Sequence, residues 1–264
     1  MLPLTDIQCF ILDMDGTIYL GSRVLSGAKD FLKLLDERNT PYYFFTNNSS
    51  KSPELYIDKL EKLGFGKYNA DRVITSGDVT RDYILKTYGA GAKAYVVGTN
   101  ALKLQFQTSG IDCVESGTPD CVVAGFDTTY NFEKAAIAVD MLREGVPFLA
   151  TNVDAVCPLD KGKVLPDCAS ICAMLTHASG AVPKYLGKPF VQTATYIQKI
   201  TGVPLEKTAI IGDRLYTDMH LAMDNGMCSI GVLSGEMTRK DIEQSDMKPD
   251  YVFNCVSGVY DSLK

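Results

Sequence analysis

The 264-residue sequence lacks the features that mark membrane proteins and nucleic-acid binders. No apolar run approaches the ~18 residues of a membrane span, and no basic segment precedes an apolar stretch near residue 1. Lys and Arg number 26 against 32 Asp and Glu, which gives a net charge of −6 and a pI near 5.0. Nucleic-acid binders attract phosphate with clustered Lys and Arg. We therefore expect a cytoplasmic protein with no membrane and no nucleic-acid partner.

Histidine is also scarce. With only two histidines in the sequence, a soft-metal site that involves the eight cysteines has little support. Cys168 and Cys172 lie one helical turn apart and His177 follows them, a pattern that could hold Zn²⁺. Cysteine is, however, a small residue that is commonly buried. Disulfide sets belong mainly to small secreted domains, and we see no export signal. We expect reduced thiols and favour a core position for this pair.

The chain contains no repeat, low-complexity tract or long linker, and its hydrophobic content of 46% is enough for a substantial core. Short apolar runs alternate with amphipathic stretches, which is typical of an α/β fold with a parallel sheet covered by helices. The apolar runs are 9–12, 42–45, 94–97, 121–124, 148–150, 209–211, 229–233 and 251–253. The amphipathic stretches are 28–37, 54–63, 102–108, 132–143, 190–200 and 218–225.

Four polar clusters stand where predicted strands end or where the chain returns to the sheet. They are Asp13-Met14-Asp15-Gly16-Thr17, Thr46-Asn47-Asn48, Lys188 in Gly187-Lys188-Pro189, and Gly212-Asp213 with Asp218. Open parallel sheets bind ligands outside the carboxyl ends of their strands. Each cluster alone could be a turn, a helix cap or a solvated charge. Their conjunction indicates a single site.

The spacing of the clusters predicts two domains. Asp13 and Thr46 are 33 residues apart, about one βαβ unit, and Lys188 and Asp213 are 25 apart. The interval from Thr46 to Lys188 is 142 residues, which a single extra βα unit cannot absorb. We therefore expect one domain at 1–79 and 182–264, with an inserted second domain at 80–181 that could lie over the strand ends.

The residue types in these clusters suit phosphoryl transfer. Asp13 could attack phosphorus, and Asp15 could give a proton to the leaving oxygen and later take one from water. Two carboxylates would repel a phosphoester unless cations neutralise them. Asp213 provides a hard oxygen ligand for Mg²⁺, and Lys188 provides a compact positive charge. Thr46 and the backbone N–H groups after it could bind the remaining phosphate oxygens.

These residues resemble the four motifs of the haloacid dehalogenase (HAD) superfamily of aspartyl-phosphate hydrolases. The continuations of the motifs are similar to those of subfamily IIA, the NagD-like or p-nitrophenyl phosphatase-like sugar phosphatases. The resemblance spans nearly the whole chain and implies a Rossmann-like core with a large α/β cap between the second and third motifs. The matching segments are Asp13-Met14-Asp15-Gly16-Thr17-Ile18-Tyr19, Thr46-Asn47-Asn48-Ser49, Gly187-Lys188-Pro189, and Gly212-Asp213-Arg214-Leu215-Tyr216-Thr217-Asp218.

The resemblance also implies a role for each matching residue. Asp13 would be the nucleophile and a Mg²⁺ ligand, and Asp15 would be the acid/base whose backbone carbonyl also binds the metal. Asp213 would be the third protein ligand, while Asp218 would support the metal through water or orient Lys188. The phosphate-binding residues would be Thr46, Asn47, Asn48 and Lys188. The substrate would be a small phosphorylated metabolite, and formation of a homo-oligomer is left open.

The cap departs from the family pattern at one segment. Many relatives have Pro-Gly-x-Gly where this chain has Pro166-Asp167-Cys168-Ala169. Glycine allows a backbone to approach a ligand closely, so specificity cannot be carried over from those relatives. Asp167 could cap the helix that starts near Ser170, or it could face the leaving group. In the second case its charge would favour neutral-headed sugar or polyol monophosphates.

Two alternatives to a phosphatase share much of this chemistry. A phosphotransferase or mutase could use the same residues, because fold and motif do not determine the acceptor. A receiver-like phospho-sensor also uses an acidic cluster, Mg²⁺, Thr and Lys on a parallel sheet. Such a sensor needs neither an acid/base at Asp15 nor a hundred-residue cap. The sequence therefore favours Mg²⁺-dependent hydrolysis of a sugar or polyol phosphate.

Overall fold

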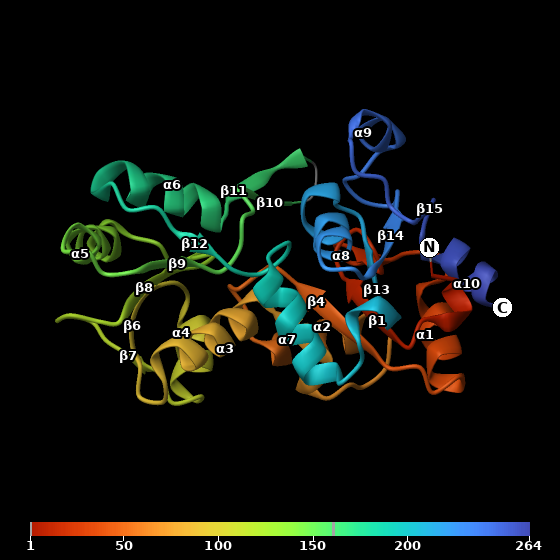
Figure 1. The fold of residues 1–264 in the computed structure, drawn as a ribbon, viewed down its shortest axis with the longest axis horizontal. Coiled ribbons are helices and arrows are strands. Elements are labelled where there is room, and N and C mark those ends of the chain that lie inside the picture. The colour runs from red at the N-terminus through yellow and green to blue at the C-terminus, as the bar shows by residue number, and fades with distance from the viewer. Residues whose placement is uncertain (1, 160–161) are drawn as a thin grey trace. The chain divides into compact units, whose positions relative to one another are not determined.

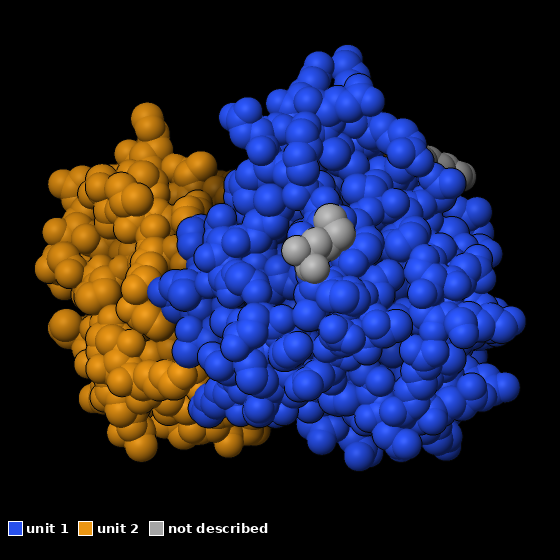
Figure 2. Space-filling view, turned by 45° about the vertical axis from the view of Figure 1, so that its right-hand side comes forward, with its two compact units in different colours: residues 1–46, 56–74, 188–264 blue, residues 47–55, 75–187 orange. Residues whose placement is uncertain are grey.

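A computed structural model describes residues 2–159 and 162–264 of the chain (Figure 1). The chain forms two compact units, coloured separately in Figure 2. Unit 1 comprises residues 1–46, 56–74 and 188–264, and unit 2 comprises residues 47–55 and 75–187. Each unit contains a largely parallel sheet with helices, so the predicted α/β class is confirmed. The predicted domain boundaries at 79/80 and 181/182 stay a prediction.

Unit 1 is built on a six-stranded sheet of order β15-β14-β13-β1-β4-β5. The central strand β1 pairs in parallel with β13 and β4, so that Leu12 lies opposite Ile211 and Asp13 lies opposite Phe45. The carboxyl ends of these three strands therefore share one edge. The strands are β1 Cys9–Asp13, β4 Tyr42–Thr46, β5 Val73–Thr75, β13 Thr208–Gly212, β14 Cys228–Val232 and β15 Tyr251–Phe253, and a small antiparallel pair is β2 Tyr19–Leu20 and β3 Arg23–Val24.

Apolar residues on both faces of this sheet explain why its central strands are uniformly hydrophobic. Phe10 and Leu12 pack with Phe31 of α1 in one core cluster, while Ile11 is buried on the opposite face. Covering a parallel strand on both sides removes the alternation of polar residues. The helices that reach into unit 1 are α1 Ala28–Glu37, α2 Pro53–Lys62, α7 Val191–Thr201, α8 His220–Asp224, α9 Arg239–Gln244 and α10 Val256–Leu263.

Unit 2 has its own five-stranded sheet of order β12-β9-β8-β6-β7 and an antiparallel hairpin of β10 and β11. Helices α5 and α6 pack together over β8, and the side chain of Asn131 caps α5 by accepting from Lys134 N. The strands are β6 Lys93–Val97, β7 Asp112–Cys113, β8 Cys121–Ala124, β9 Phe148–Ala150, β10 Val156–Pro158, β11 Val164–Pro166 and β12 Lys184–Tyr185. The helices are α3 Ser76–Tyr88, α4 Asn100–Gln107, α5 Phe132–Arg143 and α6 Cys168–Ser179.

The cysteine pair of α6 lies in the apolar core of unit 2. Cys168 and Cys172 are both fully buried, with their sulfur atoms 3.9 Å apart. A hydrogen bond from Cys168 and burial raise the pKa of Cys172, which keeps it a neutral thiol. Cys168 Sγ also donates to the carbonyl of Ala124. Both thiols therefore fill space in the core.

Several elements differ from the sequence-based expectation. Helix α3 was not predicted, although Thr75 and Asp78 form a capping box at its start. The helix expected at 218–225 begins instead as a π-helical turn, Leu215–Met219, before α8. None of the helices in the described ranges is both long enough and apolar enough to cross a bilayer.

Candidate active site

The first motif lies where β1 leaves the sheet. Asp13 is the last residue of β1, and its carboxylate is one-seventh exposed. The chain then turns at Gly16, whose φ of 92° is favourable only for glycine. A Cβ atom on Gly16 would lie 2.2 Å from Asp213 Oδ2, so this turn also requires glycine for space. Asp15 lies beyond the strand, with its side chain 57% exposed and within reach of solvent.

Lys188 joins the first and fourth motifs. Its ammonium lies 2.6 Å from Asp13 Oδ1 and 2.7 Å from Asp218 Oδ1, and it also donates to the Phe45 carbonyl at 3.4 Å. Only 2% of its side chain is exposed. Burial lowers the pKa of Lys188, but the two carboxylates outweigh burial and raise the pKa above its usual value. Lys188 is therefore held as a buried cation between Asp13 and Asp218.

Asp213 and Asp218 approach Asp13 from β13 and the π-helical turn after it. Carboxylate oxygens of the three residues lie within 4.8 Å of one another. Burial, then the negative charges of Asp13 and Asp218, raise the pKa of Asp213 well above its usual value. Burial likewise raises the pKa of Asp218 to about 6, although Lys188 opposes this shift. One ammonium facing three carboxylates leaves an excess of negative charge.

The arrangement of oxygen atoms at Asp213 fits a bound cation. Asp213 Oδ2 accepts a hydrogen bond from the backbone N–H of Glu236 at 2.8 Å. Asp213 Oδ1 is buried and has no hydrogen-bond partner within residues 2–159 and 162–264. An orphaned buried carboxylate oxygen is costly unless a cation binds it. Hard oxygen ligands of this kind suit Mg²⁺.

The structure divides the second motif between the two units. Thr46 ends β4 in unit 1, beside the strand that carries Asp13. Asn47 and Asn48 belong to unit 2, where Asn47 Nδ2 donates to Asp154 at 2.9 Å and Asn48 Oδ1 accepts from Ser50. The structure thus brings Asp13, Thr46, Lys188, Asp213 and Asp218 together in unit 1. The predicted phosphate-binding role of Asn47 and Asn48 stays a prediction.

Asp167 is a buried helix cap. It precedes α6, and its Oδ1 accepts hydrogen bonds from Cys168 N at 2.5 Å and Asn152 Nδ2 at 3.2 Å. Only 4% of the residue is exposed. Of the two roles that the sequence allowed for Asp167, the structure therefore shows that of helix cap. Its predicted part in selecting the leaving group stays a prediction.

Lys59 of α2 is a neighbour of the first motif that carries no sequence signal. Its ammonium lies 3.6 Å from Asp15 Oδ2 and 3.9 Å from the centre of the Tyr19 ring. Although its side chain reaches solvent, partial burial of Asp15 raises its pKa, and the charge of Lys59 partly opposes the rise. A raised pKa suits a group that must donate a proton near neutral pH. Lys59 lies in the middle of an ordinary amphipathic helix, so only the tertiary fold reveals it.

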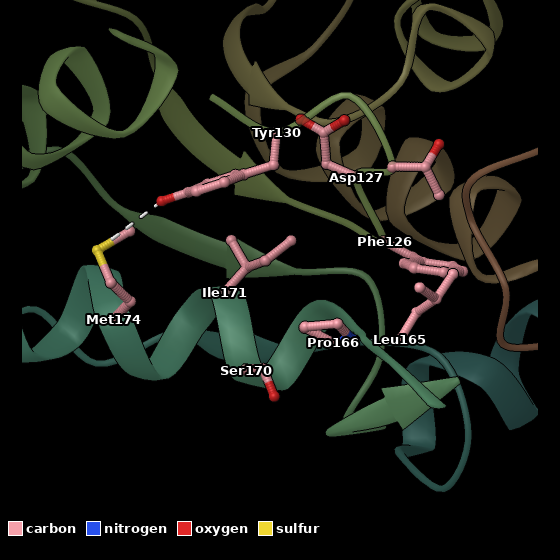
Figure 3. Close-up of a pocket in the computed structure, with 9 residues that line it drawn as sticks. Phe126, Asp127, Tyr130, Leu165, Pro166, Ser170, Ile171 and Met174 are labelled. Atoms are coloured by element: carbon pink, nitrogen blue, oxygen red, sulfur yellow. Dashed lines mark hydrogen bonds between the residues drawn. The ribbon is translucent and has the colours of Figure 1, made fainter. Parts of the chain in front are cut away.

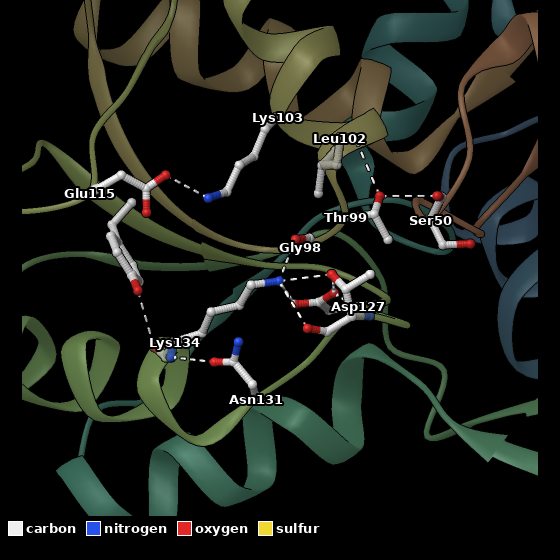
Figure 4. Close-up of polar contacts among 11 residues, drawn as sticks. Ser50, Gly98, Thr99, Leu102, Lys103, Glu115, Asp127, Asn131 and Lys134 are labelled. Carbon is white, nitrogen blue, oxygen red and sulfur yellow. Dashed lines mark hydrogen bonds and ion pairs between the residues drawn. The ribbon is translucent and has the colours of Figure 1, made fainter.

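Unit 2 contains a pocket of about 400 Å³ (Figure 3). Its lining is mainly apolar, and Tyr130 and Met174 contact each other across it through Oη and Sδ at 3.8 Å. Asp127 also lines the pocket, but its carboxylate is bound by Lys134 Nζ at 2.7 Å (Figure 4). The Thr129 hydroxyl also donates to this carboxylate. The other apolar lining residues are Phe126, Leu165, Pro166 and Ile171. The size and lining are typical of a site for a small organic molecule.

Comparisons with known proteins identify the family of the chain. Residues 10–112 match the haloacid dehalogenase-like hydrolase family, and residues 185–259 match a second HAD-hydrolase-like model. The acid sugar phosphatase of Staphylococcus aureus strain USA300 is 31% identical over 93% of this chain and 94% of its own length.

Solved structures show the same relationship. The 4-nitrophenylphosphatase of Thermotoga maritima superposes with a TM-score of 0.94 at 39% identity, covering 99% of each chain. The glycerol phosphate phosphatase of Mycobacterium tuberculosis, in complex with magnesium, superposes with a TM-score of 0.89 at 29% identity, covering 100% of this chain and 78% of that one. The resemblance found in the motifs is thereby confirmed. The chain belongs to the haloacid dehalogenase-like hydrolases, in their NagD-like branch, and its enzyme class is phosphatase.

Proposed function

We propose that the protein is a Mg²⁺-dependent phosphomonoester hydrolase that acts through an aspartyl-phosphate intermediate on a small sugar or polyol phosphate. One observation carries the proposal. Asp13, Asp213 and Asp218 converge at one edge of a parallel sheet, and a buried Lys188 bridges Asp13 and Asp218. Such a cluster is costly to fold, and a phosphoryl-transfer site explains why it is present.

Asp13 is the proposed nucleophile. A carboxylate oxygen of Asp13 forms a bond to phosphorus, while the bond from phosphorus to the ester oxygen of the substrate breaks. Asp15 gives its proton to that leaving oxygen. Water then attacks the phosphorus of the aspartyl phosphate and passes a proton to Asp15. The bond to Asp13 breaks, and inorganic phosphate and the starting enzyme are restored.

The other residues of the site bind and orient the phosphoryl group. Lys188 supplies positive charge to its oxygens, and Asp218 holds Lys188 in place through the 2.7 Å contact. Thr46, together with Asn47 and Asn48, provides hydrogen-bond donors for the same oxygens. Asp13, Asp213 and the backbone carbonyl of Asp15 would hold Mg²⁺, which when bound neutralises charge on the phosphoryl group.

Unit 2 is the proposed source of substrate selectivity. Its 400 Å³ pocket offers a mainly apolar wall for a small carbon skeleton, and Lys134 already neutralises Asp127. Because this pocket presents no free carboxylate from Asp127, it does not by itself exclude anionic groups. The acid sugar phosphatase and the glycerol phosphate phosphatase support a sugar or polyol phosphate as substrate.

A labelling experiment tests the covalent mechanism. The wild-type protein is mixed with a ³²P-labelled sugar or glycerol phosphate and Mg²⁺ and quenched in acid within one turnover. We expect labelled protein and release of inorganic phosphate, whereas Asp13→Asn should show neither while it keeps the same circular dichroism spectrum. Transfer of label to a second sugar in place of water would instead indicate a phosphotransferase. Turnover by folded Asp13→Asn would refute the mechanism.

A further inference from the structure

The second-motif loop, residues 47–50, is anchored within unit 2. The Ser76 hydroxyl donates to the Asn47 carbonyl at 2.5 Å. The Thr99 hydroxyl donates to the Ser50 carbonyl at 3.0 Å, a bond that Figure 4 shows. Ser49 Oγ pairs with Thr151 Oγ1 at 2.9 Å. Side chains and backbone on both sides of the loop are therefore bonded to unit 2, although Thr46, the residue before it, belongs to unit 1.

Asp154 is the centre of this anchorage. Its side chain is buried, and Oδ2 accepts hydrogen bonds from both Asn47 Nδ2 and Asn152 Nδ2 at 2.9 Å. A carboxylate that accepts from two amides fixes which way each amide points. Charge-assisted bonds in a buried setting are also stronger than neutral ones, and leaving the amides unpaired is costly. Asp154 therefore determines the orientation of the Asn47 side chain.

The partners of the loop come from neighbouring strand ends of the unit 2 sheet. Thr99 follows β6, and Thr151 follows β9. Phe126 follows β8, and its backbone N–H donates to Ser49 Oγ at 3.0 Å. Adjacent strands in a packed sheet form a rigid frame. A loop bonded to three of their ends takes its position from that frame.

We propose that Asp154, Ser49 and Thr151 are positioning residues for phosphate binding, through which unit 2 sets the location of Asn47 and Asn48. This inference rests on the proposed function, because it assigns these asparagines to the phosphoryl group. Unit 2 then has a role that is separate from recognition of the leaving group. It holds the two asparagines of the second motif in the same way whichever ester is bound.

This role predicts a distinct kinetic signature. A residue that contacts the leaving group changes kcat/KM by different factors for different esters. A residue that positions the phosphate loop lowers kcat/KM by the same factor for every ester, because all esters share the phosphoryl group. It also weakens binding of inorganic phosphate, which has no leaving group. The two roles are therefore separable by experiment.

The test compares Asp154→Ala, Asp154→Asn and Ser49→Ala with the wild type on p-nitrophenyl phosphate and glycerol phosphate. For Asp154→Ala we expect kcat/KM to fall about 100-fold on both esters, since a displacement of about 1 Å has this effect on a positioned group. Ser49→Ala should show a smaller but equally uniform loss. Asp154→Asn keeps an oxygen acceptor of the same shape and should recover much of the activity. The inhibition constant for inorganic phosphate should rise in parallel.

Val122→Ala is the matched control, because Val122 is buried in β8 and makes none of the loop contacts. It should lower the unfolding midpoint while leaving kcat/KM on both esters within about twofold. A wild-type protein that hydrolyses neither ester would refute the proposed function. An active wild type whose folded Asp154→Ala and Ser49→Ala variants keep full activity, or lose it on one ester only, would overturn the positioning role. Ser49→Ala decides the matter if Asp154→Ala fails to fold.

Discussion

Replacement of Lys188 by methionine tests whether the charge balance of the site is as described. Methionine keeps the length and most of the volume of lysine but removes the ammonium. The ammonium of Lys188 contacts Asp13 at 2.6 Å and Asp218 at 2.7 Å, with 2% of its side chain exposed. The variant therefore leaves Asp13 and Asp218 without the cation they share, beside a third carboxylate, Asp213. Lys33→Met is the matched control, since Lys33 pairs with Glu37 at 3.7 Å on the surface.

The expected loss of stability follows from the burial of the Lys188 ion pairs. Removing one partner of a buried ion pair typically lowers the free energy of unfolding by about 3–5 kcal/mol, whereas an exposed pair contributes about 0–1 kcal/mol. For a protein of this size the larger value corresponds to a decrease of roughly 10 °C in the unfolding midpoint. Activity should fall by about 100- to 1,000-fold, as for other charge-stabilising groups in active sites.

The loss of stability in Lys188→Met should also depend on pH. Burial raises the pKa of Asp218 to about 6, from 3.8 for an unburied carboxyl, even with Lys188 present. A carboxyl with a raised pKa binds its proton more tightly in the folded state, so its destabilising effect is complete above pH 6 and disappears below about pH 3.8. Without Lys188 the pKa of Asp218 rises further. The deficit of Lys188→Met should therefore be largest at pH 8 and shrink as the pH falls through 6.

Urea unfolding followed by circular dichroism, in EDTA at pH 5 and pH 8, measures this deficit. EDTA removes divalent metal ions, so that the measured difference reflects only the charges of the protein. We expect a deficit of several kcal/mol at pH 8 that is clearly smaller at pH 5, and little change for Lys33→Met at either pH. If Lys188→Met and Lys33→Met unfold at the same urea concentration at pH 8, the described charge balance is wrong.

Three further predictions concern Asp15 as the acid/base, the metal requirement, and Asp167 as the helix cap of α6. Asp15→Asn should slow hydrolysis of glycerol phosphate more than that of p-nitrophenyl phosphate, whose leaving group needs less protonation, and equal rate losses would remove Asp15 from this role. EDTA should abolish phosphate release, and added Mg²⁺ should restore it. Ca²⁺ should not restore it, because Ca²⁺ prefers more ligands at longer distances. Full activity with Ca²⁺ alone would contradict the assignment of the site to Mg²⁺. Asp167→Ala should lower the free energy of unfolding by about 0.5–2 kcal/mol, because it removes the N-terminal cap of α6. The ratio of kcat/KM for a sugar monophosphate to kcat/KM for its bisphosphate should stay unchanged. A shift in this ratio would show that Asp167 acts on the substrate.

The elements best predicted from the sequence are those with strong local signals. Strands β1, β4, β8 and β13 are short apolar runs, and each is found within one or two residues of its predicted range. The β10–β11 hairpin was missed because its residues are mostly exposed and show no alternation. Helix α3 was missed because four of its first five residues are Ser, Gly, Asp and Thr, which are poor helix formers inside a helix. Its capping box and the packing of α4 against it explain why it forms.

The charged part of the site was predictable because its chemistry depends on residue type at strand ends. Asp13, Lys188, Asp213 and Asp218 could be assigned to one site before any coordinates, and the structure brings their side chains together. Lys59 and the backbone N–H of Glu236 could not be found in this way. Their contribution depends on where a helix and a loop pack, and no residue pattern encodes that.

The second motif shows where reasoning from adjacency fails. Thr46 and Asn47 are joined by one peptide bond, and a strand-end motif gives every reason to treat them as one element of the core. They nevertheless belong to different compact units, and Asn47 donates to the buried carboxylate of Asp154, which is 107 residues further along the chain. In an inserted-domain architecture, the loop nearest the insertion can be stabilised more by the insertion than by its own sheet. Under the proposed function, unit 2 then has two separate tasks: its buried hydrogen bonds hold the second-motif asparagines, and its apolar pocket can vary without altering those bonds.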